Sequence, residues 1–119
     1  MSGVNRVTIL GNLGKDVELK YSANGKALAT FSVAVNEGYG EKEHVEWFSV
    51  AAWEKLAENC SKCLSKGQQV FVEGRLQTRS WDDNGTKKYR TELIASNVQF
   101  LGKRDDNQDE TDPDDLPLD

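Results

Sequence analysis

Three tryptophans are the residues of this sequence best placed to do chemistry, because each lies in a strand-like segment of alternating polarity. Trp47 and Trp53 share one phase of residues 44–53 and are separated by small side chains. Trp81 falls in the polar phase of residues 69–81, together with arginines. Indoles presented in this way can stack on unpaired bases of any identity, at roughly 1–3 kcal/mol per base. The pattern favours a surface for single-stranded nucleic acid, with packing between neighbouring strands as the alternative.

Catalytic, metal and phosphate-loop chemistry have less support. His44 is the only histidine, and no nearby partner marks a Ser/His/Asp or Cys/His arrangement, so we expect it to open a strand. Cys60 and Cys63 have Cys-x-x-Cys spacing, but zinc requires further soft ligands and a redox motif requires a βαβ context. We therefore predict both cysteines as small core residues of a helix. The glycines of residues 11–16 are too close together for a P-loop, so no enzyme, metal or cofactor is expected.

The elements that must position the tryptophans are mostly strands. Period-2 or β-rich patterns predict strands over residues 4–13, 27–36, 44–53, 69–81 and 88–101. Asn-Gly dipeptides at 24–25 and 84–85 mark turns, and the second is expected to close a hairpin between the last two strands. A helical apolar stripe through residues 54–65 ends before Gly67.

This order of elements predicts an all-β fold, a five-stranded OB-fold Greek-key barrel with one short helix between the third and fourth strands. Sandwich folds usually need about seven strands and fit less well. The same alternation predicts which residues of two strands face the core. For the second strand these are Ala27, Ala29, Phe31, Val33 and Val35, and for the fourth they are Val70, Val72, Gly74 and Leu76.

The charges of the 119 residues are segregated along the chain. All 15 Lys and Arg lie in residues 1–104, which carry +3, whereas residues 105–119 carry −8, so the total of −5 hides a mildly basic body. We expect a globular domain over residues 1–102 and a disordered acidic tail over 103–119. No apolar run approaches the roughly 20 residues that a membrane span needs. The two cysteines and the absence of a signal-like apolar start favour a reducing, cytoplasmic location.

Several ordered segments resemble those of one known family. They are residues 3–16 (GVNRVTILGNLGKD), 46–48 (EWF) with 53–58 (WEKLAE), and 66–81 (KGQQVFVEGRLQTRSW). In order, and through residues 3–102, the sequence resembles the bacterial-type single-stranded DNA-binding proteins, and a phage or plasmid version fits as well as a chromosomal one. The resemblance implies an OB-fold that assembles, usually as a homotetramer, wraps single-stranded DNA, and serves replication, recombination and repair.

The resemblance also assigns site residues. The stacking aromatics of the family fall on Trp47, Trp53, Trp81 and Tyr39. The phosphate-contacting residues fall on Arg6, Lys20, Lys42, Lys55, Lys66 and Arg79. The loop over residues 37–43 is shorter than the family's usual DNA-embracing hairpin, which bears on the length of DNA wrapped.

The acidic tail is expected to recruit replication and repair proteins. The residues expected to bind these partners are Asp114, Asp115, Leu116, Pro117 and Leu118. The family's tip ends in Phe, whereas here Leu118 takes that place and Asp119 follows it. The alternative function is a primosomal replication-restart accessory protein of the same OB family. Members of that kind lack such a tail, so the tail and the full set of aromatics favour the DNA-coating function.

Overall fold

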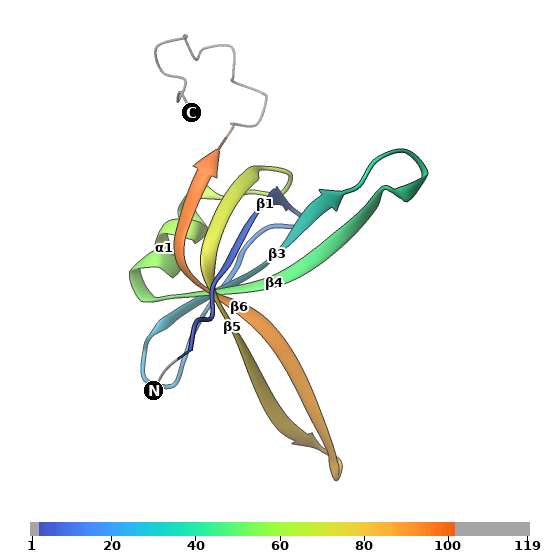
Figure 1. The fold of residues 1–119 in the computed structure, drawn as a ribbon. Helices are drawn as coiled ribbons and strands as arrows, with labels where there is room; N and C mark the ends of the chain where they lie inside the picture. The colour runs from blue at the N-terminus through green and yellow to red at the C-terminus, as the bar shows by residue number, and fades with distance from the viewer. Residues whose placement is uncertain (1–2, 102–119) are drawn as a thin grey trace.

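The computed structural model describes residues 3–101, and its elements run in the predicted order (Figure 1). The strands are β1 (Val7–Leu13), β2 (Glu18–Tyr21), β3 (Ala27–Glu37), β4 (His44–Trp53), β5 (Gln69–Asp83) and β6 (Thr86–Leu101). A short 3-10 helix, η1 (Gly40–Lys42), lies between β3 and β4, and the helix α1 (Glu54–Cys63) lies between β4 and β5. All five predicted strands and the helix are therefore present, and β2 is an additional short strand.

Five of the strands close into a barrel. Neighbours are hydrogen-bonded in the order β1-β5-β6-β4-β3-β2, and a further pairing of β1 with β3 completes the ring. Strand β2 adds to the edge of β3 outside this ring. The pairing of β4 with β6 is parallel, and the other pairings are antiparallel. This arrangement confirms the predicted OB-fold barrel.

The barrel interior is lined by the residues that the alternation predicted. Ala27, Ala29, Phe31 and Val33 of β3 are buried, and Val35 packs against them while partly exposed. They meet Val70 and Val72 of β5, together with Ala57 and Cys60 of α1. A strand with one apolar and one polar face is stable when its apolar face packs into the core and its polar face stays in water.

Two hairpins extend beyond the barrel in different directions, one formed by β3 and β4 and the other by β5 and β6 (Figure 1). Every residue from 75 to 91 is exposed, and we call this segment the β5–β6 arm. Its end is the predicted turn, in which Asn84 and Gly85 have φ of 57° and 86°, as the type I′ turn requires. The predicted core position of Leu76 is wrong: it is 42% exposed, although it pairs with the buried Leu93, because it lies at the rim of the barrel where the arm begins.

The prediction for the cysteine pair holds for one residue only. Cys60 is buried on the face of α1 that packs on the barrel, and burial, aided by the nearby Cys63 thiol, raises the pKa of Cys60 to about 11. Cys63 is exposed, so its predicted core position is wrong. The helix ends at Cys63, and the buried residues Ala57, Cys60 and Leu64 define a narrower stripe that leaves Cys63 at its edge.

Candidate nucleic-acid interface

The three tryptophans are partly exposed, as their phase predicted. Trp47 and Trp53 are 60% and 39% exposed, whereas Val50 and Ala52 of the same strand are buried in the core. Trp81 lies on the β5–β6 arm and is 41% exposed. A flat apolar ring that keeps this much accessible surface is available to stack on a planar ligand.

The indole of Trp47 packs against Gly14, in the loop after β1. A Cβ atom at Gly14 would lie 2.5 Å from Cζ3 and 2.9 Å from Cη2 of the indole. Both distances are shorter than ordinary carbon–carbon contact. The ring therefore rests directly against the Gly14 backbone, and the absence of a side chain at Gly14 sets its position.

Arg79 and Trp81 contact each other on the arm. They are two residues apart on β5 and so project from the same face. The guanidinium carbon of Arg79 lies 5.4 Å from the centroid of the Trp81 ring, within cation–π range. The Arg79 Nε donates to Glu92 Oε1 at 3.2 Å and the Nη2 donates to Oε2 at 3.4 Å, which orients the guanidinium further.

Arg90 is a site residue that the sequence analysis did not select. Its Nη2 donates to the Ser49 Oγ at 2.9 Å, and its Nε lies 3.7 Å from the second carboxylate oxygen of Glu92. Ser49 lies between the two tryptophans of β4, so Arg90 links that strand to the arm. The signal was available in the sequence: a two-residue Asn-Gly turn fixes the hairpin register, and this register places Arg90 opposite Arg79.

An open groove brings some of the predicted stacking and phosphate residues together. Trp53, Lys20 and Arg79 line one hollow. A second hollow shares Lys20 and Arg79 with the first and continues to Arg90 and Lys15. The two hollows therefore adjoin, and we call them together the groove. It is lined by one indole and four cationic side chains, together with the acidic Asp16, Glu18 and Glu92.

The other predicted phosphate residues are exposed but do not line this groove. Arg6 precedes β1, Lys55 lies on α1, Lys42 ends η1, and Lys66 lies in the turn after α1. Tyr39 lies just before η1 and is 84% exposed. The residues predicted to bind partner proteins, Asp114, Asp115, Leu116, Pro117 and Leu118, lie outside the described residues.

A closed OB barrel with exposed indoles, one of them in a groove lined by cations, defines an oligonucleotide-binding protein. The chain belongs to the single-strand binding protein family, whose model matches residues 4–101. A relative, single-stranded DNA-binding protein 1 of Chlorobaculum tepidum, is 46% identical over 110 residues, which are 87% of this chain and 68% of the relative.

The fold has a close counterpart among solved structures. A Plasmodium falciparum SSB in complex with ssDNA superposes with a TM-score of 0.79 and is 30% identical. The match covers 86% of this chain and 98% of that one. These comparisons confirm the resemblance inferred from the ordered sequence segments. Among the described residues, no helix is long and apolar enough to cross a membrane.

Proposed function

We propose that this protein binds single-stranded DNA with little sequence preference and protects it during replication, recombination and repair. The observation that carries the proposal is the groove in which Trp53 lies beside Lys20 and Arg79. An indole offers stacking to any base, and the cations offer charge to the phosphates between bases. The geometry thus supports binding, and no catalytic role is proposed.

The stacking positions are proposed to follow the exposed indoles. Trp53 lies in the groove, Trp81 lies beneath the Arg79 guanidinium, and Trp47 lies further along β4. Tyr39 supplies a fourth aromatic surface near the end of the β3–β4 hairpin. Because stacking uses the π-face that every base has, this set of residues accounts for tolerance of sequence.

The phosphate contacts are proposed in two groups. Lys20 and Arg79 line the groove, and Arg90 joins them there. The exposed cations elsewhere on the barrel, which are Arg6, Lys42, Lys55 and Lys66, would serve a strand that continues around the molecule. A strand that wraps around the molecule needs phosphate contacts outside any single groove. The scattered positions of these four cations are consistent with such wrapping.

We further propose that the chain forms homo-oligomers, most simply tetramers. Support comes from large apolar side chains that remain exposed on the barrel, such as Leu10 of β1 at 48% and Phe100 of β6 at 38%. Apolar surface of this kind is commonly covered in an assembly. Size-exclusion chromatography with light scattering, with and without oligonucleotide, measures the number of subunits.

The acidic segment is proposed to recruit partner proteins in the cytoplasm. Residues 1–102 would form the binding and oligomerisation domain, and 103–119 would form the tail. Leu116 and Leu118, separated by Pro117, could enter an apolar pocket of a partner, while Asp114 and Asp115 meet basic residues at its rim. Support comes from the charge of −8 over residues 105–119.

The test is titration with oligo-dT while tryptophan emission is recorded. We expect stoichiometric quenching, and Trp53→Ala should weaken binding by about 1–3 kcal/mol without loss of fold. Tyr89→Ala is the matched control. Tyr89 is also an exposed aromatic residue, but it lies on the face of the arm opposite to Arg79 and Trp81 and does not line the groove. Weak, partial quenching would favour the primosomal accessory instead. Equal losses in both variants would remove the groove from the DNA path.

A further inference from the structure

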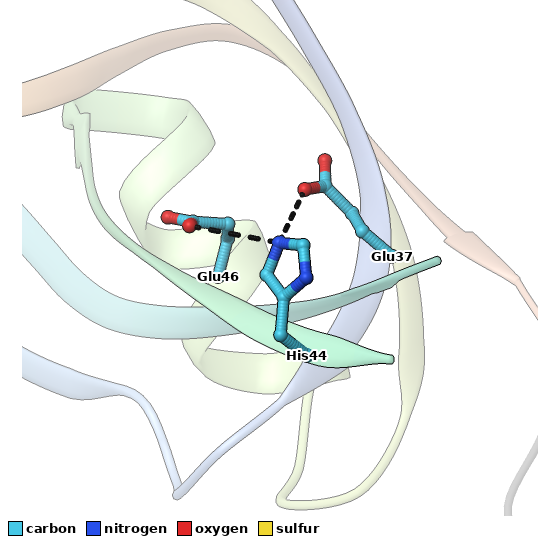
Figure 2. Close-up of side chains that lie close together, drawn as sticks. All are labelled: Glu37, His44 and Glu46. Carbon is cyan, nitrogen blue, oxygen red and sulfur yellow. Dashed lines mark hydrogen bonds and ion pairs between the residues drawn. The ribbon is translucent and has the colours of Figure 1, made fainter. Parts of the chain in front are cut away.

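Three exposed side chains converge at the base of the loop between β3 and β4, away from the groove. Glu37 ends β3 and pairs across the sheet with His44, the first residue of β4. Glu46 follows two residues later and so projects from the same face as His44. The His44 Nε2 lies 3.1 Å from Glu37 Oε1 and 3.9 Å from Glu46 Oε2 (Figure 2).

The imidazole of His44 faces acceptors on both of its nitrogens. Its Nδ1 lies 3.3 Å from the backbone oxygen of Lys42, and its Nε2 faces the two carboxylates. A neutral imidazole carries a single N–H. If Nδ1 donates that N–H to Lys42, the Nε2 lone pair points at negative oxygens. In that tautomer the Nε2 lone pair and the two carboxylates are positioned to act as ligands of one metal ion.

We propose that Glu37, His44 and Glu46 bind a divalent transition-metal ion, with Zn²⁺ the best match. Ligand atoms bound at about 2.0–2.2 Å to one Zn²⁺ lie roughly 3–3.5 Å apart. One donor atom from each of the three residues already lies within 4.8 Å of the others, and all three side chains are exposed and free to adjust. The imidazole nitrogen disfavours Ca²⁺ and Mg²⁺, which prefer oxygen ligands.

The contact of His44 with the backbone strengthens this assignment. A metal-binding histidine almost always donates its other ring N–H to a carbonyl or carboxylate, which fixes the tautomer. The Lys42 carbonyl, within η1, is in the position to accept it. The bound ion would join the end of β3 to the start of β4 and so close the loop that carries Tyr39.

Metal binding and base stacking use opposite faces of β4. Glu46 and Trp47 are adjacent, so their side chains project from opposite sides of the strand. The ion would therefore leave the indole accessible. This separation makes the metal site testable independently of the proposed DNA binding.

The experiment is titration of the full chain with ZnCl₂ against a chromophoric chelator. A Cys63→Ser background is used, because Cys63 is an exposed thiol three residues from Cys60 and offers zinc a competing ligand. We expect binding of one ion, and His44→Gln and Glu46→Gln should each weaken it more than tenfold. Glu41→Gln, an exposed acid of the same loop outside the cluster, should leave it unchanged.

Two results would overturn the proposal. Equal zinc affinity in the parent and in His44→Gln would place the ion elsewhere. Zinc binding by the parent no stronger than by the doubly substituted His44→Gln/Glu46→Gln protein would show that these side chains hold no zinc ion. Oligo-dT binding of His44→Gln, measured without zinc, should equal that of the parent, which shows that the fold is intact.

Discussion

Gly14→Ala should weaken DNA binding by displacing an indole that the substitution leaves chemically intact. The added Cβ would lie 2.5 Å from Cζ3 of Trp47, so the ring must withdraw by about 1 Å to restore ordinary contact. Gly14 is not among the glycines with positive φ, so alanine fits its backbone. Trp47 is mostly exposed, and its ring can move outward without opening the core.

The magnitude is bounded by the stacking that Trp47 can supply. Removal of one stacking aromatic costs about 1–3 kcal/mol, and a displaced ring keeps part of that contact. We therefore expect Gly14→Ala to cost about 1 kcal/mol, which is roughly a fivefold loss of affinity. Fluorescence titration with oligo-dT measures the affinity, and thermal unfolding should show no change in stability.

A double-mutant cycle with Trp47→Ala isolates the mechanism. In the Trp47→Ala background the second substitution should have almost no further effect, because the displaced ring is already absent. Gly3→Ala is the control, since a Cβ at Gly3 meets nothing within 4 Å. Additive losses from Gly14→Ala and Trp47→Ala would refute the argument, as would a Gly14→Ala protein that binds as tightly as the parent.

Four further outcomes are expected. Arg79→Gln should flatten the dependence of log affinity on log salt by about 0.7, the value of one phosphate contact on a single strand; an unchanged slope would remove Arg79 from the phosphate path. Glu92→Gln should raise affinity at low salt, because it frees the guanidiniums of Arg79 and Arg90 and removes a charge that repels phosphate; a fall in affinity would show that orientation by Glu92 matters more. Iodoacetamide at about pH 8 should give a single adduct on the folded chain, since the exposed Cys63 is accessible whereas burial raises the pKa of Cys60 to about 11; two adducts by mass spectrometry would contradict it. Deletion of residues 105–119 should tighten binding at low salt, with the gain lost as salt rises, if the tail competes for the basic surface; equal low-salt affinities would exclude that role.

The fold was predictable from the sequence to the extent that its determinants are local. Alternation with period 2 identified both the strands and the phase of each tryptophan, because the face on which a side chain lies depends only on its own strand. The Asn84-Gly85 dipeptide predicted the hairpin turn, because few other residues adopt its positive φ. The strand β2 was missed because its four residues are too few to show a period.

The two incorrect core assignments share one physical cause. Leu76 and Cys63 each lie on the apolar side of their own element, but within residues 3–101 that side is only partly covered where they lie. Alternation identifies the side on which a residue lies, whereas burial also requires a second element to pack against it. Leu76 lies at the rim of the barrel, where the arm begins, and Cys63 is the last residue of α1.

The contacts that build the groove depend on barrel closure, which no local pattern contains. The parallel pairing of β4 with β6 matches Val50 with Leu93 and Ala51 with Ile94, and it brings Arg90 to Ser49 across 41 positions of sequence. Without this pairing the indoles of β4 and the cations of the arm would belong to separate hairpins. The tryptophans could therefore be recognised one at a time from the sequence. Their combination with Arg79 and Arg90 on one face follows from the closed ring, and a continuous path for a nucleic-acid strand exists only once the ring is closed.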